Sequence, residues 1–182
     1  MTALTEPEPQ SDAALAAAYQ AGDEWAAARL VARHGPALAR YLYNSGAARS
    51  DVEDLVQDTF FRAFRALDSW RAKASFRSWL FAIAGNVFRD EYRRRKGRKI
   101  VSIEDRDLPD RSDPEAELDA ETAAERLRHG LARLPRLQRE VFLLRVQEGI
   151  DYETVAAALG TTPGAARVHY HHAVKRLKEL VK

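Results

Sequence analysis

The sequence predicts an all-α protein made of two helical domains joined by a flexible acidic linker. Apolar residues recur at three- and four-residue intervals in most segments, which is the spacing of helices with one buried face. Residues that cap helices precede several of these segments. Between residues 104 and 125, ten acidic residues stand against two arginines, and Pro109 and Pro114 interrupt the run. Such a composition is typical of a solvated, self-repelling tether.

Length and composition limit the number of domains and the class of protein. The 182 residues fit one medium or two small domains, with 31% charged and 46% hydrophobic residues. The net charge is only +2, but acidic and basic residues are segregated along the chain. The absence of cysteine excludes disulfides and thiolate chemistry. No apolar run reaches the length of a membrane span, and the first ten residues do not resemble a signal peptide. We therefore expect a cytoplasmic protein with no direct membrane insertion.

The N-terminal part predicts a disordered tail followed by short helices. Residues 1–10 are polar and contain two prolines. Ser11 and Asp12 can cap an alanine-rich helix that ends near Gln20, and Asp23 can open the next. The apolar side of that next helix is expected to comprise Trp25, Leu30, Val31, Leu38, Tyr41 and Leu42. Gly35-Pro36 should kink or interrupt it, because proline lacks a backbone donor, so three helical segments are expected before Ser50.

The segment that follows, residues 50–67, predicts a helix with an acidic outer face. Ser50 and Glu53 have the spacing of a capping box. An apolar stripe is formed by Val52, Leu55, Val56, Ala63, Phe64 and Leu67. The opposite face carries Glu53, Asp54, Gln57, Asp58, Phe61, Arg62 and Arg65. This patch, with an exposed aromatic beside it, suggests a binding surface; the alternative is an ordinary solvated helix face.

A second helix is predicted after Ser75, with Phe76, Trp79, Leu80, Ile83, Val87 and Phe88 on its apolar stripe. It ends in a cationic run that includes Arg93, Arg94, Arg95, Lys96, Arg98 and Lys99. Such a run repels itself unless a polyanion lies nearby, and nucleic acid is the usual one. The loop before the helix holds Trp70, Arg71 and Lys73, a combination that suits unpaired bases. Trp70 can equally close the edge of the domain.

The C-terminal part predicts a helix-turn-helix. Two apolar stripes are expected first, one of Ala124, Leu127, Leu131 and Leu134, the other of Leu137, Val141, Phe142 and Leu144. Asp151 then caps a helix that ends at Gly160, and Thr162 with Pro163 opens the last helix. Outward on this last helix lie Arg167, Val168, His171, His172, Lys175 and Arg176. A basic amphipathic helix after a tight glycine turn is typical of major-groove recognition.

Two stretches resemble a known family. DVEDLVQDTFFRAF followed by LDSWRAKASFRSWLFAIAGN resembles the second conserved region of bacterial RNA polymerase sigma factors of the extracytoplasmic-function (ECF) group. LARLPRLQREVFLLRVQEGIDYETVAAALGTTPGAARVHYHHAVKRL resembles their fourth region. The resemblance implies a tail over 1–10, a region-two domain over 11–97, a linker over 98–119 and a region-four domain over 120–182. Such linkers thread through the channels of the polymerase, which an acidic segment could do by mimicking nucleic acid.

The resemblance also implies partners and sites. Core RNA polymerase, through its β and β′ subunits, and promoter DNA are the expected partners, together with an anti-sigma factor. The positions matching the polymerase-docking motif are Asp54, Gln57 and Asp58. The −10 element would be melted and bound by Trp70, Arg71, Lys73, Asn86, Arg93, Arg94 and Arg95. The −35 element would be read by Arg167, Val168, His171, His172 and Lys175. His171 and His172 depart from the residues often found there, so the preferred −35 sequence stays open.

Other function classes fit less well. A stand-alone helix-turn-helix regulator would leave the acidic patch, the aromatic loop and Asn86 without a role. An enzyme acting on nucleic acid would need a cluster of ligands or a nucleophile, and no such spacing occurs. The His169–His172 run lacks a cysteine or carboxylate to complete a metal shell. We therefore expect no catalytic residue, no metal, no cofactor and no small-molecule substrate.

Overall fold

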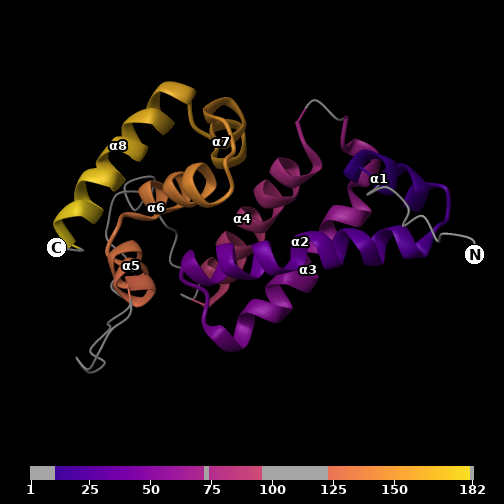
Figure 1. Ribbon diagram of the computed structural model, residues 1–182, viewed down its shortest axis with the longest axis horizontal. Coiled ribbons are helices and arrows are strands. Elements are labelled where there is room, and N and C mark those ends of the chain that lie inside the picture. Colours follow the sequence, from indigo (N-terminus) through magenta and orange to yellow (C-terminus); the bar gives the residue numbers. More distant parts are fainter. Residues whose placement is uncertain (1–10, 72–73, 96–122, 181–182) are drawn as a thin grey trace, which may run out of the picture.

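A computed structural model describes residues 11–71, 74–95 and 123–180, in two bundles of helices (Figure 1). Within these ranges the regular structure is helical and contains no strand, as the sequence predicted. The expected N-terminal tail, the acidic linker and Lys73 lie outside the described residues.

The first bundle comprises α1 (Asp12–Gln20), α2 (Glu24–Asn44), α3 (Val52–Arg65) and α4 (Phe76–Arg95), with 3₁₀ turns η1 (Arg49–Asp51) and η2 (Leu67–Ser69). The expected caps of α1 and α4 are present: the Ala14 backbone N–H donates to Ser11 Oγ, and that of Ser78 to Ser75 Oγ. Helices α3 and α4 pack on each other and on α2. The core of this bundle includes Leu30, Leu38, Leu42, Phe60, Ala63, Phe76, Leu80, Phe81 and Phe88.

Of the kink or interruption expected at Gly35-Pro36, the interruption is wrong. The helix continues through Pro36, so two α-helices rather than three segments precede Ser50. Leu30 before the proline and Leu38 after it are both fully buried, so packing on both sides outweighs the lost backbone hydrogen bond. Two residues expected on the apolar side are also exposed: Trp25 is 80% and Val31 is 39% accessible, while Ala26 and His34 are buried.

The capping box at the start of α3 is wrong as well. Ser50 lies inside the 3₁₀ turn, where its hydroxyl donates to Asp51 Oδ1 at 3.2 Å instead of accepting from the first turn of α3. The turn closes through the Asp51 backbone N–H and the Ala48 carbonyl at 2.9 Å. The apolar stripe of α3 is otherwise largely as expected, with Leu55 and Ala63 buried and Phe61 exposed.

The second bundle comprises α5 (Ala123–Ala132), α6 (Arg136–Phe142), a π-helical turn η4 (Leu143–Gln147), α7 (Tyr152–Leu159) and α8 (Pro163–Leu180). The predicted helix-turn-helix is confirmed. The Thr154 backbone N–H donates to Asp151 Oδ1 at 2.8 Å, Gly160 has φ +65°, and the Ala165 N–H donates to Thr162 Oγ1 at 3.1 Å. The expected stripe of Ala124, Leu127, Leu131 and Leu134 is only partly buried, because Ala124 and Leu127 are exposed.

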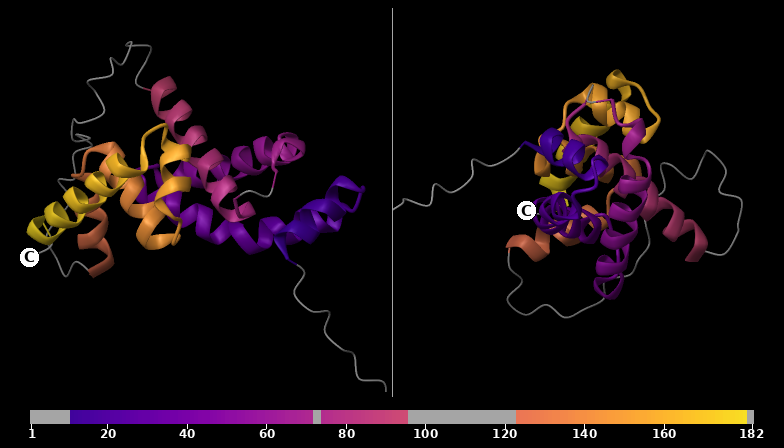
Figure 2. Two further views of the ribbon diagram at one scale, coloured as in Figure 1. Left: turned by 90° about the horizontal axis from the view of Figure 1, so that it is seen from above. Right: turned by 90° about the vertical axis from the view of Figure 1, so that its right-hand side faces the viewer.

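The two bundles contact each other. Helices α5–α8 gather beside one end of the first bundle, and α1 lies at the other end (Figure 2). Helix α7 packs on α4, while α5 and η4 contact α2. Side chains join across this boundary: Arg89 pairs with Glu140 at 3.2 Å, and Asn44 Nδ2 donates to Gln147 Oε1 at 3.2 Å. The sequence predicted two tethered domains and gave no indication of this docking.

Neighbouring residues of α2 provide a test of the packing. Leu30→Ala should lower the free energy of unfolding by about 2–5 kcal/mol, because it leaves a cavity in the core. Val31→Ala should change it by no more than about 0.5 kcal/mol, because that side chain is partly in solvent. Urea unfolding followed by circular dichroism measures both; similar losses from the two changes would contradict this account of α2.

Candidate polymerase and nucleic-acid interfaces

The residues expected to dock onto the polymerase share one exposed face of α3. Asp54 and Gln57 are exposed, and the Asp58 side chain is 41% accessible. We call Asp54, Gln57 and Asp58 the acidic ridge. The buried stripe of α3 faces α4 and α2, so helical periodicity leaves the ridge outward.

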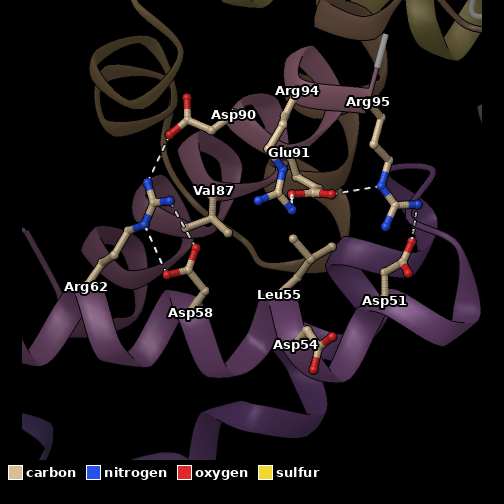
Figure 3. A pocket seen from close by; sticks show the side chains of 10 residues that line it. All are labelled: Asp51, Asp54, Leu55, Asp58, Arg62, Val87, Asp90, Glu91, Arg94 and Arg95. Carbon is tan, nitrogen blue, oxygen red and sulfur yellow. Dashed lines mark hydrogen bonds and ion pairs between the residues drawn. The ribbon is translucent and has the colours of Figure 1, made fainter. Parts of the chain in front are cut away.

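An arginine holds Asp58 in place from within its own helix (Figure 3). Arg62 pairs with Asp58 at 3.0 Å and with Asp90 of α4 at 2.9 Å. These hydrogen bonds raise the pKa of Arg62, and the one to Asp90 has the largest effect. The guanidinium thus ties α3 to α4 beside the ridge. Leu55 and Val87 lie between the charged groups of the groove that these helices form.

The other end of the groove is closed by the basic end of α4. Arg95 reaches Asp51 at 2.6 Å and Glu91 at 2.8 Å, and Arg94 reaches Glu91 at 2.6 Å. The hydrogen bond from Arg95 lowers the pKa of Asp51. Hydrogen bonds from Arg95 and Arg94 lower the pKa of Glu91, and the one from Arg95 has the larger effect. Arg93 pairs with Asp90 at 3.3 Å. All three arginine side chains remain more than half exposed, so their charges face solvent.

The aromatic residue of the loop is packed rather than free. Trp70 donates from Nε1 to the Ala74 carbonyl at 3.1 Å, and its ring lies 5.5 Å from that of Phe76 in an edge-on contact. It is half-buried against the core, whereas Arg71 is exposed. Trp70 therefore closes the edge of the domain, and only its outer part can offer a stacking surface. Phe76 and Phe88 are core residues, as expected.

Asn86 is exposed in the middle of α4, away from Trp70. It lies ten residues beyond Phe76, about 15 Å along the helix. Its Oδ1 accepts a hydrogen bond from Arg89 Nη2. The expected −10 residues are therefore spread along α4: the loop at its start, Asn86 in its middle and three arginines at its end. The structure does not bring them into one pocket.

The outward face of α8 is accessible. Arg167, Val168, His171, His172 and Lys175 are all exposed, while Ala166, Ala173 and Leu177 are buried. The Arg167 guanidinium lies 5.1 Å from the Tyr152 ring centre and 3.5 Å from Glu153. Neither contact buries it, because its side chain is 52% accessible. Helix α7 lies between α8 and α4 (Figure 1).

Known protein families match both bundles. The Sigma-70 region 2 model matches residues 30–98, and the Sigma-70 region 4 model matches residues 124–177. The sigma factor NccH of Alcaligenes xylosoxydans xylosoxydans is 37% identical over 180 residues, covering 96% of this chain and 97% of NccH. The ECF sigma factor SigE of Mycolicibacterium smegmatis is 31% identical, covering 94% of this chain and 69% of SigE. The chain belongs to the ECF RNA polymerase sigma factors.

Solved structures of sigma factors share this architecture. CnrH, in complex with the cytosolic domain of CnrY, superposes with a TM-score of 0.70 at 32% identity, covering 94% of this chain and 97% of CnrH. RpoE of Bartonella quintana, in complex with the anti-sigma factor NepR, gives a TM-score of 0.65 at 28% identity. The match covers 84% of this chain and 94% of RpoE. In the described part of this sigma factor, no helix has the length and apolar character needed to cross a bilayer.

Sequence reasoning missed the charged residues that pair between elements of this sigma factor. Arg62, Arg77 and Arg89 each reach a carboxylate on another helix or turn. Glu140 gave a weak signal, since it lies three residues after Leu137 and four before Leu144, on the predicted apolar stripe, where a charge needs a partner. Pairing across helices depends on tertiary packing, which the helical pattern does not encode.

The pairing of Asp51 with Arg95 can be tested by titration. In the wild type the Asp51 carboxyl should titrate below 3.8, its ordinary value, because Arg95 stabilises the carboxylate. This pairing favours the fold above the ordinary pKa, and the benefit is lost as the pH falls. Arg95→Gln should shift the titration upward, whereas Arg93→Gln should leave it unchanged. Carboxyl-carbon chemical shifts measure the midpoint, and equal midpoints in all three proteins would refute the pairing.

Proposed function

We propose that this sigma factor binds core RNA polymerase through the acidic ridge, melts and holds the −10 element along α4, and reads the −35 element with α8. The observation that carries the proposal is that the first bundle exposes both the acidic ridge and the basic end of α4, that the second exposes the outward face of α8, and that these bundles are matched, in order, by regions 2 and 4. A stand-alone helix-turn-helix regulator needs only the second bundle. It would leave the ridge and the basic end of α4 without a purpose.

The acidic ridge suits a basic helical partner such as the coiled coil of the β′ subunit. Asp58 is already oriented by Arg62, so little side-chain freedom is lost when it binds. Asp54, one turn earlier, and Gln57, the preceding residue, extend the surface along the same helix. Several neighbouring groups of the ridge can therefore contact a basic partner helix at once.

Along α4 the proposed roles follow the chemistry of each group. The Asn86 amide can pair with the edge of an extruded base, and the bound pocket must recover the few kcal/mol that unstacking costs. Arg71 and Lys73 would attract the strand beside the outer part of Trp70. Exposed Arg93, Arg94 and Arg95 would contact phosphates, adding affinity and salt sensitivity but no sequence choice.

On α8 the proposed base reader is Arg167, because a guanidinium can contact the edge of guanine through two hydrogen bonds. Val168 offers an apolar contact beside it, and His171, His172 and Lys175 extend the same exposed face. This face would set the −35 preference.

The remaining parts of the proposal concern chemistry and partners. The sigma factor would form and break no covalent bond itself, since the polymerase makes the RNA, and it would act in the cytoplasm with the polymerase. An anti-sigma factor is a further expected partner, supported by the similarity to RpoE, which was solved with the anti-sigma factor NepR.

Transcription with purified core polymerase tests the proposal. Core enzyme with the wild-type protein should start RNA at specific genomic sites, found by sequencing the transcripts. Asp58→Arg should lower affinity for core enzyme by about 30-fold or more, corresponding to at least about 2 kcal/mol, and abolish these transcripts while leaving helicity intact. Glu24→Arg, the same charge change on an exposed residue of α2, should leave both unchanged. The proposal would be refuted if core enzyme with Asp58→Arg made the specific transcripts as well as core enzyme with the wild type. It would also be refuted if the wild type gave no specific transcripts.

Base reading by α8 makes a separate prediction. Arg167→Ala should reduce holoenzyme binding to its best promoter by about 5- to 150-fold, the equivalent of roughly 1–3 kcal/mol, and relax the preference at one −35 base pair. Lys178→Ala, an exposed cation nearer the end of α8, should keep that preference. Selection of promoters from a library randomised at −35 measures both. An unchanged preference in Arg167→Ala would exclude Arg167 as the reader.

A further inference from the structure

Tyr152, the first residue of α7, is held by side chains from two neighbouring elements. The guanidinium of Arg145, in η4, lies 4.3 Å from the centre of its ring. Arg145 is itself fixed, because its Nη1 donates to the Ile150 carbonyl. From α8, the Tyr170 ring meets the Tyr152 ring edge-on at 6.1 Å. The half-buried Tyr152 ring therefore has an orientation set by η4 and α8 as well as by its own helix.

Arg167 of α8 lies over the same ring. Its guanidinium carbon is 5.1 Å from the ring centre, which is within the range of a cation–π contact. Arg167 and Tyr170 are three residues apart and are therefore neighbours on one side of α8. Tyr152 meets both of them, so α7 provides a fixed aromatic support at the position from which Arg167 leaves its helix.

A guanidinium uses its face and its edge for different contacts. Its N–H donors all lie in the plane of the group, so stacking on a ring through the face leaves the edge free for two hydrogen bonds to guanine. The Arg167 side chain is half exposed, and its edge can reach a partner in solvent. An arginine that is already stacked also has less conformational freedom to lose on binding. The Tyr152 contact can thus persist while Arg167 binds a base.

Glu153, the next residue of α7, acts on Arg167 in a different way. Its Oε1 lies 3.5 Å from Arg167 Nη2, so it meets the N–H edge that a base would need. The Glu153 side chain is 70% accessible, and salt screens a pair that lies in solvent. Glu153 must therefore release Arg167 before a base is read, whereas Tyr152 does not have to.

We propose that Tyr152 is a positioning residue for base reading at −35: its ring holds the Arg167 guanidinium in place and leaves the hydrogen-bonding edge free. Tyr152 acts through Arg167 and needs no contact with a base. This role rests on the base reading by Arg167 proposed above. It means that part of the −35 preference is set from α7, outside the helix that meets the bases.

The motion of the Arg167 side chain tests this support in the full chain without DNA. Nitrogen relaxation of its Nε–H should show a restricted group in the wild type. Tyr152→Leu should lower the order parameter, whereas Tyr152→Phe, which keeps the aromatic face, should preserve it. Tyr43→Leu is the matched control, because Tyr43 has a similar contact with Arg128, at 4.9 Å, away from α8. Equal order parameters for Arg167 in the wild type and Tyr152→Leu would overturn the proposal.

Selection from a promoter library randomised at −35 tests the consequence in the holoenzyme. Tyr152→Leu should weaken the preference at the base pair read by Arg167 by about 2- to 5-fold, the range expected for the loss of an exposed cation–π contact. Tyr152→Phe and Tyr43→Leu should keep the preference, and Glu153→Gln should not lower it. The salt dependence of binding should be the same in Tyr152→Leu as in the wild type, because no phosphate contact is removed.

Dependence on Arg167 separates positioning from a general structural role. In the Arg167→Ala background, Tyr152→Leu should cause no further loss of preference. A further loss of similar size there would overturn the proposal, as would an unchanged preference in Tyr152→Leu alone. A loss of preference in Glu153→Gln would assign the positioning to the carboxylate instead. Weaker binding of Tyr152→Phe to all promoters would assign the hydroxyl to a phosphate, and this too would overturn the proposal.

Failure of the proposed reader has a different signature. In that case Arg167→Ala itself keeps the −35 preference, whatever residue stands at position 152. Failure of the positioning role instead leaves the large effect of Arg167→Ala in place and removes only the effect of Tyr152→Leu. Circular dichroism checks that each variant stays helical.

Discussion

The packing of α4 against α2 and α3 is the constraint on which the rest of the structure depends. Helices α2 and α4 approach closely at Gly85, since a Cβ built there would lie 3.3 Å from the Tyr41 hydroxyl. The Tyr41 and Phe81 rings meet edge-on at 5.3 Å nearby. This contact sets which face of α4 is buried, and hence where Asn86 and the terminal arginines emerge. Helix α3 packs on both α2 and α4, and its outward face carries the acidic ridge.

Arginines in this chain act differently according to their neighbours. Arg62 joins α3 to α4, and Arg89 joins α4 to the second bundle. Arg94 and Arg167 stay largely in solvent, where they suit an external anion. A net charge of +2 conceals this division. Function follows from where each charge is held. A guanidinium that joins two helices, as in Arg62 and Arg89, is committed to the fold, whereas one that stays largely in solvent remains available.

Local sequence rules predicted the elements that depend on local chemistry. The Asp151 cap, the left-handed Gly160 and the Thr162 cap follow from backbone geometry, and the helix-turn-helix was predicted from them. The rules failed where packing prevailed: α2 continues through Pro36, and Ser50 lies in a 3₁₀ turn. The family motif located candidate site residues, and the structure leaves most of them exposed. The pairing of Arg77 with Glu148 joins residues 71 positions apart, which no local pattern encodes.

Hydrogen exchange of the full chain, alone and bound to core polymerase, tests most directly whether the acidic ridge of this sigma factor engages the enzyme. On binding, amides of α3 should exchange more slowly because the acidic ridge is covered. Unchanged exchange in α3 would contradict the account.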